Sequence, residues 1–242
     1  MNTNRKAAII AGVLLIIADV FGIPGKIISQ PLLDAPDYLI KIFANTNQIY
    51  IAALLVLIMA AACAGISVAM YPVLKKFNSG LALGSVGFRI IEAVFEFAGA
   101  ICLLLLLTLS QEFVKAGAPD LSYFQALGGL LLAAREYIAN VVMLMTWGIG
   151  ALIYCYIFYQ SKLVPRWLSG WGLVVYPLLI SASILTMFHL IIAEGTIWSV
   201  LVLPAALQEI VLAVWLIVKG FNPTVIASES AKTATNELLS AA

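Results

Sequence analysis

The sequence predicts an all-helical membrane protein: a bundle of six transmembrane helices with both termini on the cytoplasmic side. Three observations support this prediction. Of the 242 residues, 63% are hydrophobic and only 10% are charged, whereas soluble domains carry about 25% charged residues. The apolar residues gather in six runs, each close to or above the roughly 20 residues that a transmembrane helix needs. Lys and Arg concentrate in alternate loops, which indicates the orientation.

The six predicted spans follow one another with short loops between them. The first run begins after Arg5 and Lys6, as a secretory signal does, but it lacks a convincing small-residue cleavage site, so we expect a retained span. Pro24 should break or kink this helix. The third run is longer than a bilayer needs, which predicts a tilted or projecting helix. The predicted spans are residues 7–28, 49–70, 81–109, 135–159, 171–192 and 198–218.

The region before the fourth span allows two interpretations. Either 123–159 is one long helix, or 121–134 is a separate interfacial helix that leads into 137–159. The choice decides the depth of Arg135 and Glu136, which we place at the outer boundary. Residues 1–221 then form one transmembrane domain. The cytoplasmic tail, 222–242, is rich in Ser, Thr and Ala, and we expect a frayed helix or disorder there.

The basic residues predict the orientation. The N-terminus, the second and fourth loops and the C-terminus hold eight Lys or Arg, and the other three loops hold three. Because cytoplasmic loops carry the excess of Lys and Arg, both termini should be cytoplasmic. Aromatic residues fall near the predicted boundaries, as in an aromatic belt; they are Tyr71, Tyr159, Trp167, Trp171 and Trp198.

Charged residues inside the spans mark the candidate site. Arg89, Glu92 and Glu96 are spaced three and four residues apart, which places them on one stripe of the third helix. A charge at bilayer depth costs at least a few kcal/mol, so this stripe should face protein or a water-filled cavity. At about 1.5 Å per residue, Asp19 and Glu209 also come near mid-membrane.

The acids in this set outnumber the firm base by four to one, which leads to a functional hypothesis. Bare carboxylates at this depth are too costly, so some should be protonated or share a proton or cation. We therefore expect a polar cavity that binds or conducts a small ligand, ion or proton. Glu96 on the third span and Glu209 on the sixth have no evident base. If these two acids approach each other, they mark this site. The candidates are Arg89, Glu92, Glu96, Glu209 and Asp19, with Arg135, Glu136, Gln208 and His189 as secondary candidates.

Two alternative classes are also considered. In a structural or regulatory subunit, the buried charges only fix helix packing, with Arg89 paired to Glu92. An intramembrane enzyme needs a nucleophile or metal plus a base, and the single His189 has no suitable neighbour, so catalysis is disfavoured. Small residues at 80–84 and 148–150 allow close helix packing within the chain or between copies, although a homo-oligomer is not indicated.

The remaining composition bears on partners and cofactors. The formal net charge of +1 and the lack of a basic patch do not indicate nucleic acid. Cys63, Cys102 and Cys155 lie in apolar runs without Cys-x-x-Cys spacing, so they are expected to be small core hydrophobes. We expect no metal and no cofactor. The expected partners are the lipid bilayer and a small-molecule or ion ligand.

Three blocks of sequence resemble a known family. They are Tyr-Pro-Val-Leu-Lys at 71–75 with Phe-Arg-Ile-Ile-Glu-Ala at 88–93; Pro-Arg-Trp-Leu-Ser at 165–169 with Trp-Gly at 171–172; and Leu-Pro at 203–204, Gln-Glu at 208–209 and Ala-Val-Trp-Leu-Ile-Val-Lys-Gly-Phe at 213–221. In this order they resemble a bacterial integral membrane family catalogued as domain of unknown function 4386. The resemblance implies a multi-span protein of the bacterial inner membrane. It implies no activity, substrate or mechanism.

Overall fold

The computed structural model describes residues 3–117, 121–229 and 231. These residues form helices and their connections, with no strand among them. Six helical stretches are long and apolar enough to cross a membrane. The predicted all-helical class and the predicted number of candidate spans are therefore confirmed. The six stretches are Thr3–Leu33, Thr46–Leu74, Ser79–Lys115, Ser122–Ser161, Arg166–Met187 and Thr196–Val218.

Five of the six stretches are single α-helices, and the fourth contains a π-helical segment. This fourth stretch consists of α5 (Leu121–Tyr137), the π segment Ile138–Met143 and α6 (Leu144–Ser161). It is continuous, so the structure shows one long helix in place of a separate interfacial piece. The other helices are α1 (Thr3–Leu33), the short α2 (Tyr38–Ala44), α3 (Thr46–Leu74), α4 (Ser79–Lys115), α7 (Arg166–Met187) and α8 (Thr196–Val218).

Two sequence-based expectations concern the ends of the chain. Helix α1 continues through Pro24 and Pro31, so of the two expected effects of Pro24, a break or a kink, the break does not occur. Transmembrane helices tolerate proline when neighbouring groups satisfy the freed backbone. In the tail, residues 223–229 are helical. The expectation of disorder for 222–242 otherwise falls on residues that are almost all outside the described ones.

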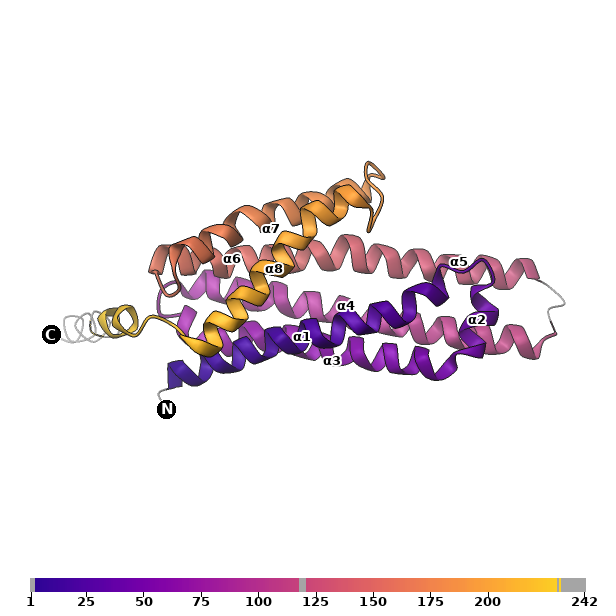
Figure 1. Ribbon diagram of the computed structural model, residues 1–242, viewed down its shortest axis with the longest axis horizontal. Coiled ribbons are helices and arrows are strands. Elements are labelled where there is room, and N and C mark those ends of the chain that lie inside the picture. Colours follow the sequence, from indigo (N-terminus) through magenta and orange to yellow (C-terminus); the bar gives the residue numbers. More distant parts are fainter. Residues whose placement is uncertain (1–2, 118–120, 230, 232–242) are drawn as a thin grey trace.

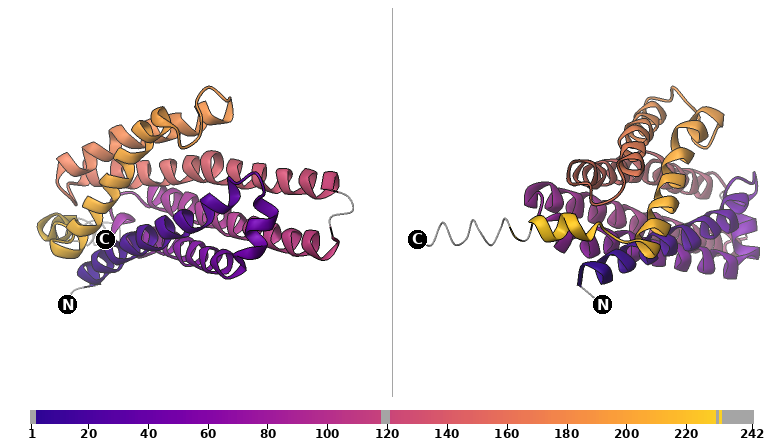
Figure 2. Two further views of the ribbon diagram at one scale, coloured as in Figure 1. Left: turned by 45° about the vertical axis from the view of Figure 1, so that its right-hand side comes forward. Right: turned by 60° about the vertical axis from the view of Figure 1, so that its left-hand side comes forward.

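The six spans form a closed ring. Each span packs against the next along the chain, and α8 packs against α1. Since the number of spans is even, α1 begins and α8 ends at the same end of the bundle (Figures 1 and 2), which we call the terminal end. At the opposite end, α2, α5 and the last part of α4 extend past the loop between α7 and α8 (Figure 1).

Side chains of α1 close this ring against α8. The guanidinium of Arg5 donates hydrogen bonds to the carbonyl oxygens of Leu216, Ile217 and Val218, which end α8 without partners in their own helix. Farther along α1, Gly12 allows close approach, since a Cβ there would lie 2.7 Å from the Ala213 carbonyl oxygen. A charged cap and a small-residue contact thus join the first and last spans.

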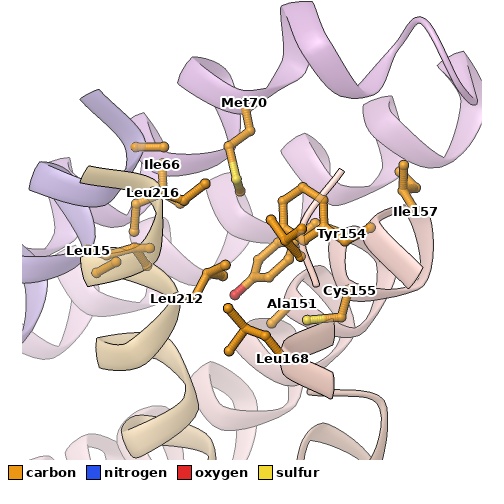
Figure 3. Packing of buried hydrophobic residues seen from close by; sticks show 14 of the residues in the cluster. Leu15, Ile66, Met70, Ala151, Tyr154, Cys155, Ile157, Leu168, Leu212 and Leu216 are labelled. Atoms are coloured by element: carbon orange, nitrogen blue, oxygen red, sulfur yellow. The ribbon is translucent and has the colours of Figure 1, made fainter. Parts of the chain in front are cut away.

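The interior of the terminal half is filled with side chains. One large apolar cluster includes Leu15, Met70, Tyr154, Leu168 and Leu212, from five different spans (Figure 3). A smaller apolar cluster lies among α1, α2, α3 and α4, and it includes Leu33, Ile42, Ile49 and Leu106. The hydroxyl of Ser110 on α4 donates to the Leu39 carbonyl, which fastens α2 to this second cluster.

The α1–α8 contact can be tested with a pair of glycine substitutions. Gly12→Ala places a methyl group against the α8 backbone, where overpacking typically costs 1–3 kcal/mol. Gly87→Ala, with nothing within 4 Å of its new Cβ, should gain up to about 1 kcal/mol of helix propensity. We expect Gly12→Ala to lower the unfolding temperature of the purified protein and Gly87→Ala to leave it equal or higher. Equal unfolding temperatures in both variants would contradict this contact.

Candidate functional site

A buried charge cluster joins α4 and α8 in the middle of the bundle. Arg89 is 1% exposed, Glu92 3% and Glu209 6%. Arg89 Nη1 donates to Glu209 Oε1 over 3.3 Å. Arg89 Nε lies 3.2 Å from Glu92 Oε2, an ion pair that lacks hydrogen-bond geometry. One guanidinium therefore lies between a carboxylate of its own helix and one of the last span.

Helix α6 completes the contacts of Glu209. Trp147 Nε1 and the Tyr154 hydroxyl donate to Glu209 Oε1 over 3.1 and 3.3 Å. The polar contacts continue from the Tyr154 hydroxyl to that of Tyr176 at 3.2 Å, and from Tyr176 to Gln208 Oε1 at 2.7 Å. All these side chains except Trp147 are buried. A polar network thus extends from the charge cluster into the filled terminal half.

Small residues of α4 and α6 create the space for Arg89. The Ser85 hydroxyl donates to the Gly150 carbonyl oxygen over 3.0 Å, which draws the two helices together. A Cβ on Gly150 would lie 3.1 Å from Arg89 Cγ. Gly150 therefore leaves room for the aliphatic part of the arginine, as expected for small residues where transmembrane helices approach closely.

A cavity of about 700 Å³ lies in the other half of the ring, among α1, α3, α4, α5, α6 and α8. Along α1 its lining residues run from Ala18 to Asp34, about 24 Å at 1.5 Å per residue. Along the opposed α5–α6 helix they run from Leu132 to Trp147. Asp34 and Glu194 are both exposed, so the cavity reaches the surface at the end opposite the termini. Ala18 and Trp147 lie at its deep end.

The charged groups that line this cavity are mostly acidic. The acids are Asp19, Asp34, Glu96, Glu136 and Glu194, and the bases are Lys26 and Arg135. At the surface, Lys26 Nζ is 2.7 Å from Glu194 Oε1 and 5.4 Å from the centre of the Trp198 ring. The guanidinium of Arg135 donates to the neutral side chains of Ser29 and Gln30, over 3.4 Å each. With all seven groups ionised, the wall carries three negative charges in excess.

Three polar side chains of the cavity lack partners within the described part of the chain. Asp19 Oδ2 is buried and makes no hydrogen bond. Glu96 makes neither an ion pair nor a hydrogen bond with any described residue. Asn140 is only 6% exposed, and its carboxamide likewise makes no hydrogen bond with any described residue. It belongs to the π segment, a type of distortion that is frequent at functional sites. The cavity thus presents carboxylates and an amide whose bonding capacity is unused.

The structure divides the sequence-predicted residues into two groups. Arg89, Glu92 and Glu209 form the charge cluster, with Gln208 at the far end of its polar network. The cavity wall contains four others: Asp19, Glu96, Arg135 and Glu136. No described contact joins Glu96 to Glu209, so the two unpaired acids of the sequence lie in different groups. His189 lies outside both, with its ring Nε2 3.4 Å from the Tyr137 hydroxyl.

Some residues of the site carry no signal in the sequence. Trp147 lines the cavity while its Nε1 bonds to Glu209, so it separates the cavity from the charge cluster. Asn140 and Trp198 also line the cavity. Nothing in their local sequence distinguishes them from ordinary residues of a span or its boundary. Among the described residues no group of three or more His, Cys, Asp or Glu is placed to hold a metal ion.

The charge cluster predicts a large effect of removing its base. Arg89→Met keeps the length of the side chain but leaves two carboxylates buried without a cation. Breaking a buried ion pair in this way costs about 3–5 kcal/mol, so we expect low membrane abundance and a lower unfolding temperature. Adding Glu92→Gln and Glu209→Gln should restore much of the loss. Arg166→Met, at an exposed position, is the control. If Arg89→Met were as stable as the wild type, Arg89 would not be the cation that stabilises the two buried carboxylates.

Neighbouring alanines of α8 test the cavity. Ala206 lines it, whereas Ala205 is completely buried in the core. In a Cys102→Ala background, where the remaining cysteines are buried, we expect Ala206→Cys to react with a membrane-impermeant maleimide from one side of the membrane only. Ala205→Cys should stay unreactive. An unreactive Ala206→Cys would show that water does not reach the cavity, and equal reaction of both positions would contradict the burial of Ala205.

The comparisons with known proteins bear on the whole chain. No curated protein and no solved structure matches it. A family model, Domain of unknown function (DUF4386), matches residues 10–220. The matched range includes the charge cluster and every residue of the cavity wall named above. Because the match covers most of the 242 residues, the chain belongs to the DUF4386 family, as its sequence resemblance predicted.

Proposed function

We propose that this protein binds a small cationic ligand or ion in the intramembrane cavity. Asp19 and Glu96 are the binding carboxylates, and Asn140 supplies a neutral polar contact. The observation that carries the proposal is the Asp19 carboxylate, which lines a cavity and has a buried oxygen without a hydrogen bond. A buried charge normally requires a partner. A bound cation is the partner that satisfies it.

The charge of the wall supports a cation over an anion. Lys26 is paired with Glu194, so its charge is neutralised at the surface. Arg135 is the only other base among the described residues of the wall, and its hydrogen bonds go to the neutral side chains of Ser29 and Gln30. Asp19 has no base of its own in the cavity. A positive ligand therefore reduces the excess of acid, whereas an anion would increase it.

The proposed orientation places the cavity on the outer side of a bacterial inner membrane. The excess of Lys and Arg in the N-terminus, even-numbered loops and C-terminus favours a cytoplasmic terminal end. The cavity reaches the surface at the opposite end. Labelling of Ala206→Cys in intact cells, without labelling from the cytoplasmic side of inverted vesicles, is the result this orientation requires.

For the charge cluster we propose a structural role, because each of its three charged groups lies close to an opposite charge, at 3.2 Å on α4 and 3.3 Å between α4 and α8. Arg89 is paired with two carboxylates, and Glu209 also accepts from Trp147 and Tyr154. Such a network fixes the rotation of α4, α6 and α8 relative to one another. It also closes the deep end of the cavity, so the bound cation stops at the level of Asp19 in this conformation.

Isosteric neutral variants test the proposed function. Asp19→Asn and Glu96→Gln remove the negative charges and keep the side-chain shapes. A ligand at one hundred times its Kd stabilises the native state by about 2.7 kcal/mol. We expect at least one cation from a panel of sodium, magnesium and alkylammonium chlorides to raise the unfolding temperature of the full chain in nanodiscs, and this rise to be lost in the double variant.

The matched control is Glu112→Gln on the same helix as Glu96. Glu112 is exposed and paired with Lys115 at 2.8 Å, away from the cavity. Its substitution should leave the cation-dependent rise unchanged. The proposal fails if no cation in the panel stabilises the wild type, or if the double variant and Glu112→Gln respond alike.

A further inference from the structure

We infer that the ligand of this cavity is an amphipathic organic cation, a protonated or quaternary amine with an apolar body. This inference rests on the proposed function and specifies its ligand class. A bare metal ion or proton needs only oxygen ligands. The cavity offers more than oxygen ligands. Features of its wall match both the charged group and the apolar body of an amphipathic organic cation.

Most of the cavity wall is apolar. The residues that line it include Val56 and Met59 of α3, Leu132 of α5, Met143 of the π segment and Val202 of α8. A volume of about 700 Å³ falls within the range of about 300–1,000 Å³ that is typical of small-molecule sites. Apolar surface in contact with water is unfavourable, and an organic body that displaces this water gains roughly 25 cal/mol per Å² buried. The wall therefore favours a ligand with carbon surface.

The carboxylates that interrupt this apolar wall come from two different helices. Asp19 comes from α1 and Glu96 from α4. Asp19 lies at the deep end, one turn of helix from Gly22, which lacks a side chain and also lines the cavity. These acids then hold the cationic group of a ligand in the deep part of the cavity. The apolar body of the ligand extends from there along the wall toward the surface.

The protein's own Lys26 shows how the wall receives an amine. Its ammonium group lies 2.7 Å from Glu194 Oε1 and 5.4 Å from the centre of the Trp198 ring. A carboxylate and an indole face together are a favourable environment for a cation. The same two kinds of group recur elsewhere in the cavity wall, where Trp147 supplies an indole and Asp19 and Glu96 supply carboxylates without an ion-pair partner among the described residues. This second set lacks an internal amine, and the ligand supplies it.

Asn140 gives a third, independent indication of a ligand. The residue is only 6% exposed, and its side chain lines the cavity without a hydrogen-bond partner among the described residues. The π segment brings it into the wall between Ala139 and Met143. The side-chain oxygen of Asn140 carries a partial negative charge that attracts either a protonated or a quaternary ammonium, and it can also accept a hydrogen bond where the ligand has an N–H.

The experiment measures binding of radiolabelled benzyltrimethylammonium to the full chain in nanodiscs, with empty nanodiscs to subtract lipid partition. Unlabelled competitors separate the features of the probe. Tetramethylammonium has the charge without the apolar body, benzyl alcohol has the body without the charge, and phenylacetate has the opposite charge. We expect each of these three to compete at least about tenfold more weakly than unlabelled benzyltrimethylammonium does, a difference of about 1.4 kcal/mol.

Three variants assign the binding to the cavity. Asp19→Asn and Glu96→Gln should each weaken binding of the probe at least about tenfold, and the Glu112→Gln control should not. Ala206→Leu fills the apolar part and keeps every charge, so it should abolish binding of the probe but preserve stabilisation by small inorganic cations.

The outcomes separate this inference from the proposed function. If sodium or magnesium stabilises the protein through Asp19 and Glu96 while benzyltrimethylammonium does not bind, the ligand class is wrong and the proposed function stands. The same holds if tetramethylammonium competes as well as the benzyl probe. If no cation binds, or if phenylacetate is preferred, both are wrong.

Discussion

The structure depends on one interaction, the neutralisation of Arg89 inside the bundle. Water is excluded at this depth, so a guanidinium must find its partners in the protein. It finds them on α4 itself and on α8, while α6 donates two further hydrogen bonds to Glu209. Rotation of any of these three helices would leave a charge unpaired. The cluster therefore sets their rotations, and the small residues Ser85 and Gly150 allow the approach that it needs.

This constraint divides the ring into two halves. Below the cluster, toward the terminal end, side chains fill the interior, and Arg5 and Gly12 hold α1 against α8. Above it, the helices enclose a cavity in which acidic groups outnumber bases. Trp147 belongs to both halves, because it lines the cavity and bonds to Glu209. Paired charges thus lie where the bundle is packed, and Asp19 and Glu96, which have no ion-pair partner among the described residues, line the cavity.

Properties of single helices were predictable from the sequence. Apolar runs of sufficient length predicted six spans, because crossing a bilayer is a local requirement of length and hydrophobicity. The spacing of Arg89 and Glu92 predicted a pair on one helix face, since residues three apart are neighbours. The continuity of α5 with α6 was left open, because a helix and a helix–turn–helix share the same composition there. The family was predicted from short blocks in the right order.

Relations between helices were not predictable in the same way. Glu96 and Glu209 looked alike in the sequence, as unpaired acids near mid-membrane, yet one lines the cavity and the other meets Arg89. Asn140 and Trp147 gained their places only through the π segment and the ring closure. The sequence by itself determined that charged groups lie within the membrane, because residue type and depth are local. Only the tertiary structure decided which of them are paired, because pairing depends on the rotation and contact of helices far apart in the chain.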